Sequence, residues 1–517
     1  MTSAGLQARG VVQGFRSSQR VWIFLALFIA AWLLSLTGFN SADEAWTMQV
    51  VHRVRAGTVL YREAFLGVTP LSIWAGLGWT ALFGAGVASF KALAAFQFAT
   101  SALLIQELAH RCGLRGTALI ALPVALLGSA WNPQASLYPG LASLGGVASL
   151  MMLLQGKDQT TRRSLAWAGL FAGLAFAAKQ TIGVFALGAA VASLPLLGLG
   201  PRSILPLVGG FLLGALPPLI PVVWQGGLPD LWEYGFAGKG LYLRTTSFLY
   251  LESLGGLRAL LDPTATLVWF RQGVGGLAFL LPPLALAVWL GPRRGRGEHR
   301  TAMDLVGLSS LSALAGTLPM ADAYHLSFAM PQCVLLLLLG LDLDRSTADP
   351  IRIPWRRWCA GAVWAWALVL VAGRFGGGAM RFLGRGSQPS RLPYFAGLPA
   401  LPQERGGIEA SLAQLVAVAG GRPVFILSRG ASAWYLATGL RNPTAYDYPT
   451  VPAFGRTGEA RIIAQIEQGR IPLVAVRADA IDRWPRTERL EAWIRQRMTP
   501  QGRAGEFELY GPPEDRQ

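Results

Sequence analysis

The chain has 517 residues, of which 52% are hydrophobic and only 14% are charged, whereas soluble proteins carry about a quarter charged residues. Its mean hydropathy is +0.41, although it contains 45 basic residues and a net charge of +17. These values exclude a soluble enzyme and a disordered chain, and they indicate a protein that crosses a membrane many times. The three cysteines and four histidines are scattered without metal-ligand spacing, so the sequence predicts neither a disulfide framework nor a zinc site.

The first predicted membrane helix covers residues 21–38 and follows Arg9, Arg16 and Arg20. The run is longer than a signal-peptide core and no A-x-A cleavage site follows it, so we expect a retained helix. Arginines before the helix place residues 1–20 in the cytoplasm, which makes residues 39–86 the first outer loop. Within this loop the apolar run 71–84 has only 14 residues, and we interpret it as re-entrant or interfacial.

With that interpretation, eleven helices satisfy the positive-inside rule, and the membrane domain covers residues 21–375 with a long outer loop at 225–272. The net charge therefore records topology and does not indicate nucleic-acid binding. The predicted fold class is an α-helical polytopic membrane protein with a small C-terminal α/β domain outside the cytoplasm. The predicted helices cover residues 21–38, 87–109, 116–130, 137–154, 164–178, 182–199, 203–224, 273–290, 303–318, 324–341 and 358–373.

Residues 376–517 change in composition. The segment up to about residue 407 is rich in Pro, Gly and Arg and is typical of a linker. Helix-like and strand-like runs then alternate, which predicts a small α/β domain. The helix-like runs are 408–419, 459–468 and 487–498, and the strand-like runs are 424–427, 472–476 and 506–510.

An acidic pair, Asp43 and Glu44, stands at the mouth of the first helix. Ser41 would cap a helix whose third position is Glu44, which is the pattern of a capping box. Alternatively, a carboxylate at the membrane boundary acts as a base or binds a metal. Adjacent carboxylates point to different sides of a helix, so we expect only one of them to face a cleft.

The acidic pair is followed at residues 57–74 by GTVLYREAFLGVTPLSIW, and together they resemble the GT-C glycosyltransferases. The resemblance is to the branch of protein O-mannosyltransferases and lipid A aminoarabinose transferases. It implies inverting transfer of a sugar from a polyprenyl-phosphate donor to a lipid, glycan or protein acceptor outside the cytoplasm. It also implies a bacterial inner-membrane location, a periplasmic C-terminal domain, Asp43 as general base and Glu44 as a helper or capping residue.

The leaving group of such a reaction is a lipid phosphate, which requires a nearby cation. Lys179 is the basic residue in the short outer turns, although a lysine there also snorkels to lipid headgroups. The hairpin turn with Tyr324 and His325, and Arg271 at the entry to helix 273–290, are further candidates for phosphate binding. The aminoarabinose branch has a lysine before its Pro-Pro-Leu turn where this chain has Thr69, so that substrate does not carry over.

Candidate contacts to sugar or acceptor are Tyr61 and Arg62 in the first outer loop and Trp232 and Tyr242 in the long outer loop. Outer-loop aromatic residues also form the interfacial belt. Arg53, Arg55 and Arg62 are interpreted as partners of headgroups or carboxylates. A divalent metal stays open, because two adjacent acids are too few ligands to indicate one.

Two other functional classes remain. A secondary transporter or flippase predicts repeated halves and charges at mid-membrane, whereas Asp43, Lys179 and His325 lie near the predicted outer boundary. A non-catalytic GT-C-like assembly subunit would have no need of the acidic pair.

Overall fold

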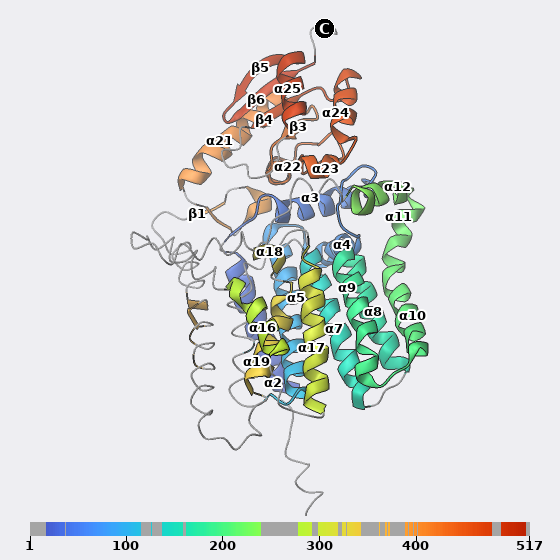
Figure 1. The fold of residues 1–517 in the computed structure, drawn as a ribbon. Helices are drawn as coiled ribbons and strands as arrows, with labels where there is room; N and C mark the ends of the chain where they lie inside the picture. The colour runs from blue at the N-terminus through green and yellow to red at the C-terminus, as the bar shows by residue number, and fades with distance from the viewer. Residues whose placement is uncertain are drawn as a thin grey trace, which may run out of the picture.

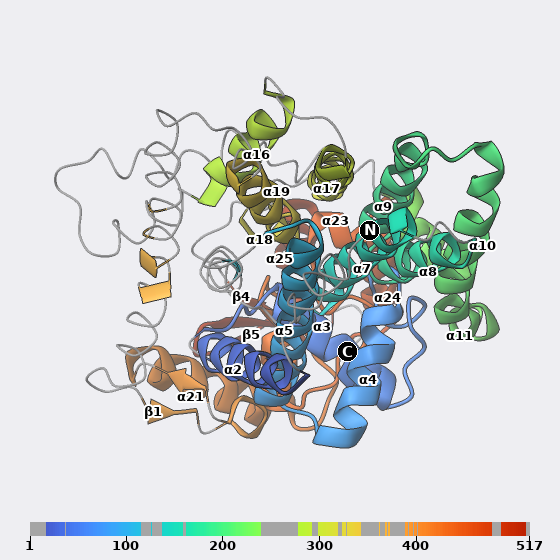
Figure 2. The same ribbon diagram turned by 90° about the horizontal axis from the view of Figure 1, so that it is seen from below.

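The computed structural model describes residues 17–36, 38–114, 137–158, 162–238, 278–291, 298–318, 323–326, 328–342, 388–390, 392–396, 398–400, 402–477 and 487–512, and a few single or paired positions between 122 and 372. A bundle of long helices carries a small domain with a β-sheet at one end, and the helix α3 (Asp43–Arg55) lies crosswise between the two (Figure 1). The predicted architecture, a helical membrane bundle with a small C-terminal α/β domain, is confirmed, and the location of that domain outside the cytoplasm stays a prediction. Viewed along the bundle, α5 and α7 lie near the middle and α10 lies at one edge (Figure 2).

The helices of the bundle follow the hydropathy pattern of the sequence. Four stretches of the described chain are long and apolar enough to cross a membrane: Ser18–Ser35, Val87–Arg111, Gln180–Leu197 and Pro201–Trp224. The predicted helices 116–130 and 358–373 lie almost entirely outside the described residues, so the count of eleven stays a prediction. The bundle helices are α2 (Ser17–Ser35), α5 (Val87–Arg111), α7 (Tyr138–Asp158), α8 (Arg162–Ala178), α9 (Gln180–Ser193), α10 (Ile204–Ala215), α11 (Ile220–Trp224), α16 (Leu281–Leu290), α17 (Glu298–Ala315), α18 (Ala323–Leu326) and α19 (Met330–Asp342).

Two predicted continuous helices are interrupted. The run 203–224 forms α10 and α11 with a 3-10 turn at Pro217–Leu219 between them, because proline has no backbone N–H to donate to the preceding turn. The run 324–341 ends as α18 at Leu326 and resumes as α19 at Met330, whose second residue is Pro331. Proline is favoured in the first turn of a helix, so it marks a new start there.

The short apolar run of the first outer loop forms α4 (Leu71–Phe83), a helix of 13 residues. At 1.5 Å per residue such a helix is about 20 Å long, whereas the hydrocarbon core of a bilayer is about 30 Å thick. Its length agrees with the interpretation that it does not cross. It packs beside α3 at the sheet-domain end of the bundle (Figure 1).

Glycines let α8 and α10 touch backbone to backbone. A Cβ atom on Gly173 would lie 2.2 Å from the carbonyl oxygen of Phe211, and one on Gly210 would lie 2.0 Å from the carbonyl oxygen of Ala166. Gly169 and Gly214 are equally confined. Pairs of glycines four residues apart allow membrane helices to pack closely, since burial of apolar surface supplies little attraction in lipid.

The C-terminal domain is α/β, as predicted. Its four-stranded sheet has the order β3-β4-β6-β5, with β3 and β4 parallel and the other neighbours antiparallel. A pair of two-residue strands, β1 and β2, precedes it. The predictions did not include α22, α23, β5 or the short strands β1 and β2. The elements of the domain are β1 (Gln388–Pro389), β2 (Pro399–Ala400), α21 (Pro402–Ala419), β3 (Phe425–Leu427), α22 (Ala431–Thr438), α23 (Val451–Phe454), α24 (Gly458–Glu467), β4 (Val474–Arg477), α25 (Glu488–Arg497), β5 (Thr499–Ala504) and β6 (Phe507–Gly511).

One hydrophobic core joins the first outer loop to the C-terminal domain. It runs from Trp46 on α3 and Phe65 in the loop to Tyr446, Phe454 and Val474 in the domain. The domain is therefore packed on the outer loop over a continuous apolar contact and is not merely tethered by the linker-like segment before it.

Candidate active site

The acidic pair begins α3, and Asn40 organises that start. The Asn40 side-chain oxygen accepts hydrogen bonds from the backbone N–H groups of Ala42 (2.9 Å) and Asp43 (3.1 Å). Its own backbone N–H donates to Oε2 of Glu44 (2.7 Å). The predicted capping box on Ser41 is wrong: Ser41 is exposed and Ala42 is the N-cap residue. Asparagine takes over this role because its side chain reaches the backbone two residues ahead.

Glu44 is buried in an ion pair that the sequence interpretation missed. The Nζ atom of Lys91, on α5, lies 3.0 Å and 3.3 Å from the two carboxylate oxygens of Glu44, and both side chains have no exposed surface. The same ammonium donates to the backbone carbonyl of Gly38 (2.7 Å). A lysine in an apolar helix requires a partner, so this residue type at this position could have predicted a buried acid nearby.

Asp43 occupies a different environment from Glu44. It is half-buried, and its Oδ2 atom accepts a hydrogen bond from the Asn40 side-chain amide (3.1 Å). Successive helical residues are separated by about 100°, so the two carboxylates diverge, as expected. Glu44 is engaged by Lys91, whereas Asp43 is engaged by Asn40. Within the described ranges, no three His, Cys, Asp or Glu residues gather closely enough to hold a metal ion.

The family-like segment after α3 folds into a tight turn around Tyr61. The backbone N–H of Tyr61 donates to the carbonyl of Ala64 (2.8 Å), and its hydroxyl donates to the carbonyl of Val68 (2.7 Å). The side chain is fully buried, its φ is +68°, and burial raises the pKa of its phenol well above the usual value. A non-glycine residue with this φ is strained and is retained where the surroundings fix it. Tyr61 therefore holds the loop in place.

The turn at residues 67–70 is tied to the junction of α8 and α9. The Gln180 amide donates to the carbonyls of Gly67 (3.4 Å) and Gly235 (2.8 Å). The Thr69 hydroxyl is buried and donates to the carbonyl of Phe176 at the end of α8. Thr69 stands where the aminoarabinose transferases have a lysine, and its hydroxyl makes a structural hydrogen bond to the end of α8.

Lys179 and His325 meet at one aromatic ring. Lys179 separates α8 from α9 in an extended conformation, and its side chain is 7% exposed. Its Nζ atom lies 4.5 Å from the ring centre of Phe328 and 3.4 Å from the carbonyl oxygen of Gly316. The half-buried His325 ring packs edge-on against the same phenylalanine, with ring centres 5.7 Å apart. The structure therefore brings two of the four predicted phosphate-binding residues into one neighbourhood.

Of the other predicted site residues, the structure describes Trp232 and Arg62. Trp232 closes the short helix α12 (Leu228–Trp232), is 63% exposed, and stacks on Phe236 with ring centres 5.4 Å apart. Arg62 is exposed, and its charge acts on Asp230, whose pKa is nonetheless raised by burial. Arg271 and Tyr242 lie outside the described residues, as does the side chain of Tyr324.

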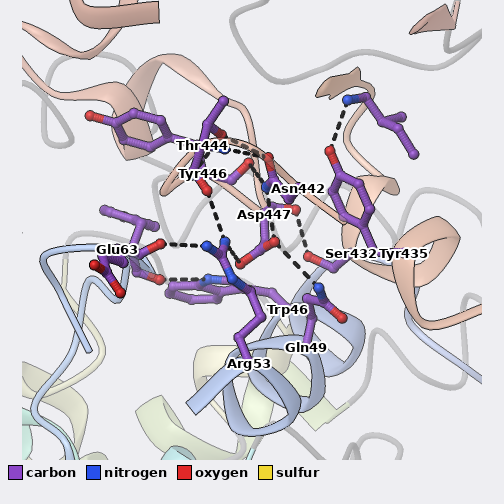
Figure 3. A network of polar contacts seen from close by, with 12 residues as sticks. Trp46, Gln49, Arg53, Glu63, Ser432, Tyr435, Asn442, Thr444, Tyr446 and Asp447 are labelled. Atoms are coloured by element: carbon purple, nitrogen blue, oxygen red, sulfur yellow. Dashed lines mark hydrogen bonds and ion pairs between the residues drawn. The ribbon is translucent and has the colours of Figure 1, made fainter. Parts of the chain in front are cut away.

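Above α3, a buried polar network connects the first outer loop to the C-terminal domain (Figure 3). Arg53 forms an ion pair with Asp447 (2.8 Å), which has no exposed side-chain surface. The predicted role of Arg53 as a carboxylate partner is confirmed. The partner itself was missed, because the two residues are 394 positions apart in sequence.

A second contact lies farther out, where the π-helix Glu233–Ala237 continues α12. Glu233 accepts two hydrogen bonds from Arg456 of the C-terminal domain (2.7 Å and 3.1 Å). The hydrogen bonds from Arg456 hold the pKa of Glu233 below its usual value. The hydroxyls of Tyr234 and Tyr446 are 3.4 Å apart beside this pair. The domain is therefore fastened to two separate outer segments.

Comparison with known proteins rests on the fold. No protein-family model matches the chain, and no curated protein matches it in sequence. The crystal structure of ArnT from Cupriavidus metallidurans in the apo state matches with a TM-score of 0.57 and 14% identity, over 96% of this chain and 98% of that one. The chain has the GT-C fold. This fold, including the C-terminal domain, thus extends over nearly the whole chain.

Two longer proteins match with lower TM-scores. The arabinofuranosyltransferase AftD from Mycobacteria matches with a TM-score of 0.44 and 16% identity, over 96% of this chain and 40% of its own. The arabinosyltransferase EmbB from Mycobacterium smegmatis matches with a TM-score of 0.34 and 15% identity, over 74% of this chain and 45% of its own. The fold assignment rests on the match to ArnT alone, and at 14% identity the reaction must be argued from the site.

Proposed function

We propose that the chain is a membrane glycosyltransferase that moves a sugar from a polyprenyl-phosphate donor to a hydroxyl group of a lipid, glycan or protein. The reaction takes place at the outer face of a bacterial inner membrane, with the N-terminus cytoplasmic and the C-terminal domain periplasmic. The observation that carries the proposal is the division of the acidic pair on a GT-C fold. Glu44 is buried and neutralised by Lys91, whereas Asp43 is half-buried at the start of α3.

Asp43 is the general base of the proposed reaction. The acceptor hydroxyl passes its proton to the Asp43 carboxylate as its oxygen bonds to the anomeric carbon. The bond from that carbon to the phosphate oxygen breaks, and polyprenyl phosphate leaves with the electron pair. Attack from the side opposite the leaving group inverts the anomeric centre. A carboxylate within hydrogen-bond reach of the acceptor suits this role. Glu44 supports the helix start and takes no part in the proton transfer.

Lys179 and His325 bind the donor phosphate in this proposal. Negative charge develops on the phosphate oxygen as the bond breaks, and a fixed cation stabilises the transition state more than the ground state. A nearly buried ammonium group is costly at a membrane helix end, and contact with a phosphate would offset that cost. Arg271 and Tyr324 complete the proposed phosphate site.

The sugar or the acceptor contacts Arg62, Trp232 and Tyr242 in this proposal. The exposed ring of Trp232 beside Phe236 offers an apolar face of the kind that stacks on a sugar. Tyr61 contributes indirectly, since its contacts are with the backbone of its own loop.

The functional class is tested with purified protein in lipid nanodiscs, supplied with polyprenyl-phosphate sugars and candidate acceptors. Acceptor-dependent release of polyprenyl phosphate supports a glycosyltransferase. Movement of intact donor across a vesicle membrane without release would support a transporter or flippase instead. Binding of donor with neither outcome would support an assembly subunit.

Topology is tested by labelling Ala85→Cys with a membrane-impermeant thiol reagent. We expect labelling from the outer side of the membrane. Labelling from the cytoplasmic side would mean that residues 71–84 cross the bilayer, and the count of eleven helices would be wrong.

A further inference from the structure

The C-terminal domain reaches α3 with a single buried carboxylate. Asp447 has no exposed side-chain surface, and its Oδ2 atom lies 2.8 Å from a guanidinium nitrogen of Arg53. Its Oδ1 atom accepts from the amide groups of Asn442 (2.9 Å) and Gln49 (3.4 Å). The Ser432 hydroxyl donates to the backbone carbonyl of Asp447 (2.6 Å). Asn442 and Ser432, which belong to the same domain, therefore hold the Asp447 carboxylate in position (Figure 3).

Arg53 joins three segments through one guanidinium group. Besides Asp447, it donates to the carbonyl of Thr444 in the domain (2.9 Å) and to the carbonyl of Glu63 in the first outer loop (2.6 Å). The loop and the domain also share a backbone hydrogen bond, from the N–H of Phe65 to the carbonyl of Ala445 (2.7 Å). The planar guanidinium fixes the direction of several bonds at once, which a lysine would not do.

One face of α3 is devoted to the domain. Trp46, Gln49 and Arg53 recur at helical spacing and so lie along one side of the helix. Trp46 stacks on Tyr448 with ring centres 5.8 Å apart, and the other two contact Asp447. The opposite side carries Glu44, which pairs with Lys91 of the bundle. The helix is thus clamped between a buried ion pair from the bundle and a second one from the domain.

This arrangement has a consequence for Asp43. Arg53 lies ten residues after Asp43 on the same continuous helix, a distance of about 15 Å along its axis. Because α3 is one continuous helix held on both faces, a shift of the helix at Arg53 also moves Asp43 at its start. Separating the domain would expose the apolar core that it shares with the first outer loop and would break the backbone hydrogen bond from Phe65 to Ala445, which opposes detachment.

We propose that the C-terminal domain is a fixed part of the catalytic centre, and that Asp447 is a positioning residue that holds α3, and through it Asp43, by way of Arg53. This inference rests on the proposed role of Asp43 as base. The domain is accordingly not a mobile acceptor-binding module. Displacement of a catalytic group by about 1 Å costs up to about a hundredfold in rate, so loss of the clamp lowers turnover without removing any group that touches substrate.

The experiment compares Asp447→Asn and Arg53→Lys with wild type in the full-length protein in nanodiscs. Glu508→Gln is the matched control, because Glu508 is a carboxylate of the same domain that pairs with Arg495 and Arg503 at the surface. Hydrogen exchange of amides 43–55 reports on α3, and exchange of β3 and β4 reports on whether the domain remains folded. Turnover of donor at saturating acceptor gives kcat and KM.

We expect amides 43–55 to exchange at least about tenfold faster in Asp447→Asn, with β3 and β4 unchanged. We expect kcat to fall by about ten- to a hundredfold, with KM for the donor within about twofold of wild type. Arg53→Lys, which keeps the charge, should lie between Asp447→Asn and wild type in both measurements, and Glu508→Gln should match wild type.

Unchanged exchange over residues 43–55 in Asp447→Asn would overturn the clamp, whatever the activity. Faster exchange with unchanged kcat would overturn its link to the base. The double variant Arg53→Met/Asp447→Leu removes both charges together and should be less impaired than Asp447→Asn, since neither charge is left unpaired. An equal or greater loss of kcat would place one of these charges in the chemistry and overturn the positioning role. If wild type transfers no sugar, the proposed function fails, while the exchange measurements still decide the clamp.

Discussion

The buried pair of Lys91 and Glu44 makes the most quantitative prediction. Both side chains have no exposed surface, and Lys91 makes three hydrogen bonds, two to the carboxylate and one to the carbonyl of Gly38. Replacing Lys91 by Met keeps most of the apolar stem of the side chain but leaves the Glu44 carboxylate buried without its cation. Breaking one side of a buried ion pair costs about 3–5 kcal/mol, or more than a hundredfold in the folding equilibrium.

The double variant Lys91→Met/Glu44→Gln should recover most of this loss. A glutamine oxygen still accepts the backbone N–H of Asn40 that Glu44 now accepts, and no charge remains buried. The three hydrogen bonds of the ammonium group are lost and the Gly38 carbonyl loses this donor, but no charge is left unpaired, so a cost of about 1–2 kcal/mol remains.

The assay is SDS-induced unfolding in mixed micelles of wild type, both single variants and the double variant. Arg20→Met is the control, because Arg20 is exposed and Glu107 keeps Arg111 as a second partner, so the loss should be about 0–1 kcal/mol. The reasoning is refuted if Lys91→Met loses no more stability than Arg20→Met. It is also refuted if the double variant is less stable than Lys91→Met, since the two charges would then not act as a pair.

Three further predictions concern other parts of the molecule. Gly210→Ala should force α8 and α10 apart and destabilise the bundle by about 1–3 kcal/mol, because its Cβ would lie 2.0 Å from a carbonyl oxygen. Gly209→Ala, which has open space around its Cβ position, should be neutral in the same unfolding assay. Equal effects of the two variants would contradict the packing. Glu233 has a lowered pKa in the folded protein because of Arg456. Its contribution to stability is therefore present above the unfolded pKa of about 4.3 and is lost as the pH falls through the lower pKa of the folded state. The difference in Tm between wild type and Glu233→Gln should shrink on acidification, and a constant difference would contradict the pair. Lys179→Met should lower kcat/KM for the donor by about a hundredfold through loss of phosphate stabilisation. Thr181→Val removes only a hydroxyl that is bonded to the same Gly316 carbonyl, and it should retain activity. Equal losses of activity in the two variants would assign Lys179 a structural role.

The sequence was sufficient for features that depend on local pattern. Apolar runs predicted most of the bundle helices, since hydropathy and length determine which segments can cross a bilayer. The run at 71–84 predicted a short helix, and α4 has 13 residues; that it does not cross the membrane stays a prediction. Alternating helix and strand runs predicted the α/β domain, and the acidic pair marked the start of α3.

Contacts between segments that are distant in sequence could not be predicted from local pattern. Lys91 is a single lysine in an apolar helix, and only the fold shows that Glu44 faces it. Asp447 is an ordinary acid in a loop of the C-terminal domain, and its ion pair with Arg53 exists because the domain packs on α3. The capping box failed for a local reason, since Ser41 and Asn40 are both good capping residues and it is the Asn40 side chain that accepts the backbone N–H groups of Ala42 and Asp43.

The central claim is that Asp43 is the base of a glycosyl transfer. Its most direct test is formation of glycosylated acceptor from a radiolabelled polyprenyl-phosphate sugar by wild type and by Asp43→Asn, with donor binding measured in parallel. We predict that the variant binds donor like wild type and forms product at least about a hundredfold more slowly, since it lacks the proton acceptor. Product formed by Asp43→Asn at the wild-type rate would contradict the account.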